Sequence, residues 1–455
     1  MDIVPLRAYL PVFALAFIVA AFGGSSRYDN VQFVFLQPLS WFLVAMLLLR
    51  VRYAELSGFR TPILLLGGIA ALTALQLVPL PASLWTQLPG REVVADIDRA
   101  MGVELWRPLS MVPARTLHAL SNLAIPAAAL LSFMKLRTRS VVPIAVAICA
   151  LAALNAALGF LQFAFPASDV LRFYHGPNTG QPIGLFANPN HAGVFAAINL
   201  VFIAVMLAAH SQRMSPQTRI GLVAVYILVF LIGIMSGSRA GLLTNAVALF
   251  ATALIALFAR GTSREGFRHA KQAKGRLVSL AAASVGGVIA ATFILANRLP
   301  AFDALINADP LEDMRFTLNP VVWDMASSYF PFGTGFGTFE KVYYIHEPDA
   351  LLQPAYINMA HNDWWQFLLE GGVLAGALGI AVLAWLVGIG LEARREGRSP
   401  EFIEIISTTI IVAIASAVDY PMRTPIFMLV MVWAVLCVAY TGVYEDGKVR
   451  PSASA

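Results

Sequence analysis

"HNDWWQFLLEGGVLAGALGIAVLAWLVGIGL" (residues 361–391) sets the class of fold. Its second half, from Val373 to Leu391, holds no charged residue and approaches the about 20 apolar residues that cross the hydrocarbon core of a bilayer. Its first residues are polar, and they are followed by two tryptophans, which are typical of a membrane–water interface. The stretch therefore predicts a transmembrane helix with His361, Asn362 and Asp363 at its surface end.

The rest of the 455-residue chain repeats this apolar character. It is 58% apolar and 13% charged, with a mean hydropathy of +0.73, whereas soluble domains have about 25% charged residues. These values predict an all-α polytopic membrane protein with about twelve transmembrane helices. The predicted spans lie near residues 8–23, 31–49, 61–80, 117–134, 141–165, 191–209, 220–236, 241–259, 277–296, 365–391, 402–418 and 425–443.

The first run has two interpretations. Arg7 before it and small residues after it are typical of a signal peptide, but the many later spans favour an uncleaved first helix. The two cysteines, Cys149 and Cys437, both fall within apolar runs and are interpreted as small core residues rather than as a disulfide or metal pair.

The distribution of basic residues predicts which ends of the spans face the cytoplasm. With the N-terminus inside, 20 of the 31 lysines and arginines fall in inside segments and 11 outside, whereas 9 of the 26 acidic residues are inside and 17 outside. This bias predicts a multi-pass membrane protein whose N-terminus and short basic loops face the cytoplasm. The net charge of +5 reflects the inside loops, and without a soluble basic face we expect no nucleic-acid partner.

The chain has no separable soluble domain, so residues 1–455 are predicted to form one integral membrane domain. Two outside loops are long, at about 81–116 and 297–364. The second is too long for a plain connector and is expected to contain short helices. Residues 314–330 have apolar side chains at helical spacing, with a break expected at Pro320. Residues 444–455 are expected to form a disordered cytoplasmic tail.

The loops on the outer side contain most of the polar residues without an evident structural need. Because ATP is absent outside the cytoplasmic membrane, bond formation there requires a substrate that arrives already activated. A sugar on a polyprenyl pyrophosphate meets this requirement, since the pyrophosphate is the leaving group. A protein that binds it needs fixed positive charge, preferably from arginine, whose planar guanidinium matches phosphate oxygens.

"IMSGSRAGLL" (234–243) places Arg239 in a very short outside turn. The structural interpretation is an arginine that snorkels at the end of a helix. The functional interpretation is a phosphate contact, because the neighbouring glycines allow close approach to the backbone and a helix begins there. "DMRFTLNPVVW" (313–323) raises the same choice for Arg315, which either pairs with the adjacent Glu312 and Asp313 or clamps a phosphate.

His361 lies at the depth of the lipid headgroups, where a neutral imidazole can accept a proton from a sugar hydroxyl. Asp363 either orients this histidine or faces elsewhere. Asn362 and Asp363 also suit the cap of the following helix. A lone histidine is more often structural than catalytic, so the spacing alone does not establish a catalytic role.

"PIGLFANPNHAGVFAAINL" (182–200) is a second candidate stretch. Asn188 and Asn190 precede a span, Asn190 is predicted to be the N-cap, and His191 is predicted to lie in the first helical turn. "FPFGTGFGTF" (330–339) is interpreted as a flexible turn in the loop. Because the histidines form no close pair and no C-x-x-C motif occurs, we expect no metal site and no cofactor.

Together, "GLFANPNHAG", "SGSRAG", Arg315 followed by "PFGTGFGTF", and "HNDWWQFLLEGG" resemble the O-antigen ligase and O-antigen polymerase superfamily of bacterial envelope glycosyltransferases. The resemblance covers about residues 180–380 and implies a GT-C-like helical fold. It implies a donor glycan on undecaprenyl pyrophosphate, transfer with inversion and without metal, and either lipid A–core or a growing glycan as acceptor. His361 then matches the family's loop histidine, which is taken as the base or as a key acceptor contact, and Arg239 and Arg315 match the arginines placed at the pyrophosphate.

The resulting hypothesis is a metal-independent glycosyltransferase of a bacterial inner membrane whose active site faces the periplasm. Arg239 and Arg315 hold the pyrophosphate, His361 takes the proton from the acceptor hydroxyl, and Asn188, Asn190, His191, Asn362 and Asp363 are further candidates for substrate contact. The alternative is a transporter or flippase of a lipid-linked sugar, although the predicted spans lack charges at their centres. Ligase and polymerase are not distinguished, and neither are the sugar, the linkage and the oligomeric state.

Overall fold

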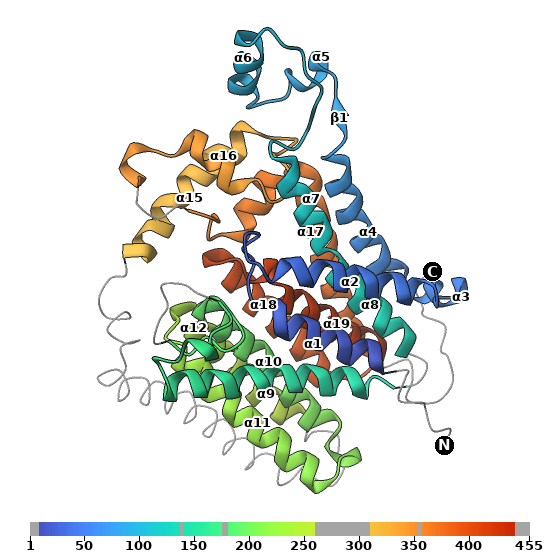
Figure 1. Ribbon diagram of the computed structural model, residues 1–455. Coiled ribbons are helices and arrows are strands. Elements are labelled where there is room, and N and C mark those ends of the chain that lie inside the picture. Colours follow the sequence, from blue (N-terminus) through green and yellow to red (C-terminus); the bar gives the residue numbers. More distant parts are fainter. Residues whose placement is uncertain (1–8, 137–139, 175–180, 260–309, 353–356, 442–455) are drawn as a thin grey trace.

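The computed structural model describes residues 9–136, 140–174, 181–259, 310–352 and 357–441; for residues 54, 213, 310–316 and 441 it describes the backbone alone. This part of the chain is almost entirely helical (Figure 1). Its α-helices are α1 (Leu10–Phe22), α2 (Phe33–Leu48), α3 (Tyr53–Leu56), α4 (Arg60–Leu75), α5 (Ala82–Trp85), α6 (Glu92–Ala100), α7 (Pro113–Asn122), α8 (Ala124–Leu136), α9 (Val142–Ala164), α10 (Pro189–Ala209), α11 (Pro216–Met235), α12 (Arg239–Ala259), α15 (Pro310–Ser328), α16 (Phe339–His346), α17 (Asp363–Arg395), α18 (Ser399–Val418) and α19 (Pro425–Thr441).

The described residues include eight helices that are long and apolar enough to span a membrane, and three shorter apolar helices. These correspond to eleven of the twelve predicted runs; the remaining run, 277–296, lies outside the described residues. The prediction of an all-α polytopic membrane protein is therefore confirmed.

Helix α10 lies at the centre of one part of the bundle, packed against α9, α11, α12 and α18. Every residue from His191 to Val205 is buried. Small residues allow the backbones to approach closely, as is common between helices in membranes. A Cβ atom at Gly193 would lie 2.8 Å from the Cα of Gly241, so the first turns of α10 and α12 are in contact. The Asn245 side chain closes this contact by donating to the carbonyl of Gly193 at 3.0 Å.

The connections that the charge bias assigns to the outside meet at one end of the bundle, called the outer end below. The backbone N–H of Ala187 donates to the carbonyl of Gly24 at 3.0 Å, and that of Ile426 donates to Gly23 at 3.2 Å. At the opposite end, Lys135 of α8 pairs with Glu55 of α3 at 2.7 Å. The helices thus run between two distinct polar ends, as the sequence predicted.

The long loop before α17 contains the expected short helices. Contrary to the expected break at Pro320, α15 continues through this proline. An internal proline costs a helix one hydrogen bond, but here the helix is supported by packing. Its Leu318 and Val322 are buried in a small separate core with Tyr343 of α16 and Leu369 of α17, so the loop lies directly against the start of α17 (Figure 1).

A small unit formed by residues 79–108 stands out from the bundle at the top of Figure 1. The short antiparallel strands β1 (Pro79–Leu80) and β2 (Arg107–Pro108) form its base, and α5 and α6 lie beyond them. The Arg107 guanidinium binds Asp98 of α6, which lowers the pKa of that carboxyl below its ordinary value. Arg91 anchors the unit by donating to the carbonyls of Leu109 and Gly333 at 2.8 and 3.0 Å.

Candidate functional site

His361 occupies an unusual backbone position at the start of α17. Its φ angle is +51°, the one positive φ of a non-glycine residue in the ranges that the structure describes. Such left-handed residues are strained and cluster at functional sites. The next residue, Asn362, caps α17 by accepting from the N–H of Trp365 at 3.2 Å. The predicted capping role of Asn362 is therefore confirmed, and the cap fixes the turn that carries His361.

The carboxylate of Asp419, which directly follows α18, lies between two histidines. Its Oδ1 atom is 3.7 Å from Nδ1 of His361 and 3.7 Å from Nε2 of His191. These distances are too long for hydrogen bonds but suit electrostatic attraction. Asp419 is only 1% exposed, whereas the His361 side chain keeps 21% of its surface exposed.

Two asparagines bind the other oxygen of Asp419. Oδ2 accepts from Nδ2 of Asn188 at 3.1 Å and from Nδ2 of Asn190 at 2.8 Å. The sequence placed the N-cap at Asn190, which is wrong: α10 begins at Pro189, and the side chain of Asn188 caps it by accepting from the N–H of Asn190. Proline suits the first helical position because its missing N–H is not needed there, so the cap falls one residue earlier than the proline.

His191 lies in the first turn of α10, as predicted, and is buried. Its Nδ1 atom is 3.1 Å from the hydroxyl of Thr424, and its ring meets the rings of Tyr420 and Phe427 edge-on. These contacts join the start of α10 to the connection between α18 and α19. His191 therefore faces Asp419 from a fixed position within the protein.

The environment of Asp419 favours its ionised form. Burial by itself raises the pKa of this carboxyl, but the charges and polar contacts of His191 and His361 lower the pKa well below its ordinary value. Asp419 also accepts from the N–H of Tyr420 at 3.0 Å. A fixed negative charge thus faces His361 on the Nδ1 side of its ring.

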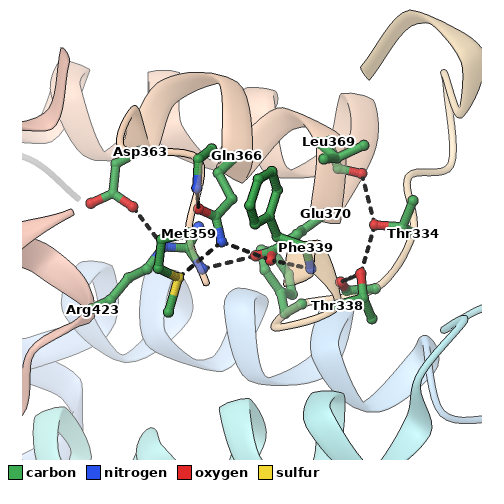
Figure 2. A network of polar contacts seen from close by, with 12 residues as sticks. Thr334, Thr338, Phe339, Met359, Asp363, Gln366, Leu369, Glu370 and Arg423 are labelled. Carbon is green, nitrogen blue, oxygen red and sulfur yellow. Dashed lines mark hydrogen bonds and ion pairs between the residues drawn. The ribbon is translucent and has the colours of Figure 1, made fainter. Parts of the chain in front are cut away.

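Asp363 does not face His361; it pairs with Arg423, which lies in the turn Pro421–Arg423 before α19. Arg423 Nε donates to Asp363 at 2.6 Å, and Nη1 donates to Glu370 at 2.9 Å. Figure 2 shows this arginine reaching α17 from the neighbouring connection. Glu370 is fully buried. The three charged side chains fasten the turn that follows Asp419 to the helix that follows His361.

A network of neutral groups continues from Glu370 (Figure 2). Gln366 donates to Glu370 at 3.0 Å and accepts from the N–H of Ala360, the residue before His361, at 2.9 Å. The glycine-rich turn 330–339 is held against α17, since the N–H groups of Thr334 and Gly335 donate to carbonyls there at 3.0 and 2.9 Å. The prediction of a turn is confirmed, but hydrogen bonds hold this turn in place, contrary to its interpretation as flexible.

Arg239 is the first residue of α12 and is partly buried. The contact between Gly241 and Gly193 puts the first turn of α12 beside the first turn of α10, which contains His191. Arg239 is therefore at the same end of the bundle as the Asp419 cluster. Arg315 lies within α15, and its side chain lies outside the described part of the structure.

A cavity of about 360 Å³ lies at the outer end. Its lining comes from residues 26–29 before α2 and from α4, α7, the start of α16, α17, α18 and the turn before α19. Asp363 and Arg423 line it; Arg239, His361 and Asp419 are not among the described lining residues. The described ranges contain no group of three histidine, cysteine, aspartate or glutamate side chains placed to hold a metal ion.

The helical multi-pass fold is that of an integral membrane protein, and the polar cluster at one of its ends is the candidate site. A model of the O-antigen ligase family matches residues 224–380 of this chain. The match confirms the resemblance drawn from the motifs and supports a membrane glycosyltransferase of the O-antigen ligase and polymerase superfamily. Five of the predicted site residues lie within the matched range: Arg239, Arg315, His361, Asn362 and Asp363. No curated protein matches the chain at a significant level.

Sequence reasoning missed Asp419, Arg423 and Glu370. A signal for the first two was present in "VDYPMRTP" (418–425), a short connection that carries an acid and an arginine between two apolar runs. This is the same feature that drew attention to Arg239. Glu370 is the tenth residue of the "HNDWWQFLLEGG" motif, a carboxylate within an otherwise apolar stretch. A buried carboxylate at such a position requires a cationic partner.

Proposed function

We propose that this protein transfers a glycan from undecaprenyl pyrophosphate to a hydroxyl of an acceptor sugar at the periplasmic face of a bacterial inner membrane. The acceptor is lipid A–core in a ligase or the next lipid-linked glycan in a polymerase, and the proposal includes both. The observation that carries the proposal is that the carboxylate of Asp419 lies 3.7 Å from Nδ1 of His361, whose imidazole is partly exposed. The match to the O-antigen ligase family supports it.

His361 is the proposed base. With its Nδ1–H toward Asp419, the lone pair of Nε2 is available to the acceptor hydroxyl, and the carboxylate stabilises the imidazolium that forms. The acceptor oxygen bonds to the anomeric carbon as the bond between that carbon and the pyrophosphate breaks. The proton passes to Nε2, and undecaprenyl pyrophosphate leaves with the electron pair, with inversion at the anomeric carbon.

Arg239 and Arg315 are the proposed ligands of the pyrophosphate. Fixed positive groups at the place where charge develops stabilise a transition state without reorganisation. The start of α12 adds backbone N–H groups that favour an anion. Because the leaving group is already activated, this mechanism requires neither a nucleotide nor a metal ion.

The test is a reconstituted assay in liposomes with undecaprenyl-pyrophosphate glycan and the acceptor lipid, both extracted from a strain that lacks the gene, in the presence of EDTA and without nucleotide. The wild-type protein is expected to extend or transfer the glycan with inversion, as read by NMR of the new linkage. A His361→Ala variant is expected to lose activity, whereas His346→Ala, which changes a loop histidine bound to Tyr329, should retain it. Full turnover by His361→Ala would falsify the assignment of the base.

A further inference from the structure

The cavity at the outer end adjoins the turn that carries His361 and the connection that carries Asp419. Met359 and Asp363, which flank His361, line it, and so do Ser416 and Met422, which flank Asp419. Within the described residues, His361 and Asp419 themselves do not. The turns that carry these two residues therefore form part of the cavity wall. A volume of about 360 Å³ falls in the range of pockets for small ligands.

Each cationic arginine that lines the cavity pairs with a carboxylate of the same lining. Arg27 pairs with Asp29 at 2.7 Å, Arg115 with Glu340 at 2.8 Å, and Arg423 with Asp363 at 2.6 Å. The guanidinium of Arg115 also lies over the ring of Tyr28. Both members of the Arg115–Glu340 pair are only 9% exposed.

This charge balance argues against a pyrophosphate in the cavity. Binding an anion through Arg115 would compete with Glu340, and separating this buried pair leaves an uncompensated charge at a large cost. A neutral ligand rich in hydroxyl groups needs no such exchange. Hydroxyls can donate to the carboxylates and accept from the arginines while the ion pairs stay in place.

The remaining lining suits the apolar faces of a sugar. Tyr28, Phe336 and Trp364 contribute aromatic rings, and aromatic side chains combine a large apolar face with a polar edge. Trp364 is 41% exposed, so part of its surface remains open to a ligand. Asn358 adds an amide with both a donor and an acceptor.

We propose that this cavity binds the acceptor sugar, and that the pyrophosphate of the donor lies apart from it, at the start of α12. This inference rests on the proposed function and assigns the two substrates to separate sides of the His361 turn. The acceptor reaches Nε2 of His361 along residues 359–363, while Asp419 occupies the Nδ1 side.

The experiment measures binding rather than turnover, so it is independent of the reconstituted assay. Protein in nanodiscs is titrated with a lipid-free and phosphate-free oligosaccharide that is released by mild acid from the polysaccharide of the same strain. Binding is measured by isothermal titration calorimetry or by NMR saturation transfer. Trp364→Ala is expected to weaken binding about tenfold, as is typical for the loss of an aromatic contact together with its buried area. Asn358→Ala changes a second, smaller side chain of the cavity lining and is also expected to weaken binding.

Trp106→Ala is the matched control, since Trp106 is 68% exposed and does not line the cavity; it should bind like the wild type. Undecaprenyl pyrophosphate without a glycan should not compete with the oligosaccharide. Absence of binding by the wild type, unchanged binding by both Trp364→Ala and Asn358→Ala, or displacement by undecaprenyl pyrophosphate would each overturn the proposal. Displacement would show that the cavity holds the carrier lipid. Failure of the proposed function would appear separately, as absence of transfer by the wild-type protein.

Discussion

Nδ1 of His361 lies 3.7 Å from Oδ1 of Asp419, and the two residues flank a helical hairpin at its open end. His361 precedes α17, and Asp419 follows α18, which packs against α17 along its length. Two antiparallel helices joined by a short connection bring the first residue of one beside the last residue of the other. The hairpin therefore sets a negative charge beside the proposed base.

Asp419→Asn is expected to lower kcat at every pH at which the wild type is active. The pKa of Asp419 is well below its ordinary value, so this residue stays ionised throughout any practical assay and its charge acts over the whole range. Removing the charge withdraws electrostatic stabilisation from the imidazolium that forms during transfer, so the base accepts the proton less readily. Its stabilising contribution to the fold is present at neutral pH and is lost only in strong acid.

The check is kcat/KM between pH 5 and pH 9 for Asp419→Asn and for Asp98→Asn. Asp98 is also an ion-paired carboxylate, bound to Arg107 in the protruding unit, and its variant should keep the wild-type profile. A kcat equal to that of the wild type in Asp419→Asn would show that the carboxylate does not act on the catalytic proton.

Arg423→Gln is expected to destabilise the protein by roughly 3–5 kcal/mol, because it leaves the buried Glu370 and the partly buried Asp363 without their cation. Arg423→Lys lacks the planar guanidinium but keeps the positive charge, so it should lose less stability than Arg423→Gln. Thermal unfolding in detergent measures the effect. Arg99→Gln removes an exposed pair with Asp96 and should leave the melting temperature unchanged; equal losses in the two glutamine variants would contradict the buried-triad interpretation.

The helical fold could be predicted because a bilayer allows few solutions. Every backbone group must be satisfied within the membrane, so apolar runs of sufficient length become helices. The course of α15 could not be predicted, since the continuation through Pro320 depends on Leu318 and Val322 packing against Tyr343 and Leu369. Those contacts join segments that are distant in the sequence, and local propensity carries no information about them.

The candidate site was predictable in part for the same reason. Hydropathy and charge bias placed His191, Arg239 and His361 at one end of the bundle, where the described structure also has them. They did not show which outer connections meet. Asp363 is nearest to His361 in sequence but turns to Arg423, while the distant Asp419 takes the place beside the imidazole. Which carboxylate lies beside the imidazole depends on how α17 packs against α18. It also depends on how the start of α10 packs against the segment before α17 and the segment between α18 and α19.

Asn188→Ala and Asn190→Ala form a matched pair of variants. Each removes one hydrogen bond to Asp419, so both are expected to lower kcat to a similar extent. Asn188 also caps α10, so its variant should lose about 1 kcal/mol more stability than the other. Unfolding and kinetics of the two purified proteins test this. Equal stability would show that the cap contributes nothing, and unequal kcat values would show that the two amides do not act on Asp419 alike.

Gly193→Val is expected to impair catalysis through the contact between α10 and α12. A Cβ atom at this position would lie 2.8 Å from both the Cα of Gly241 and the Oγ of Ser236, so the helices must move apart. The movement separates Arg239 at the start of α12 from the cluster around His191. Because Arg239 is the proposed pyrophosphate contact, KM for the lipid-linked donor should rise along with the loss of kcat.

Gly221→Val in α11 is the control, because a Cβ atom there meets nothing within 4 Å, and it should behave like the wild type. Steady-state kinetics with varied donor, together with a thermal unfolding curve, separates a displaced arginine from a general loss of folded protein. A Gly193→Val protein that melts like the wild type and keeps its donor KM would show that the spacing of α10 and α12 does not position the donor.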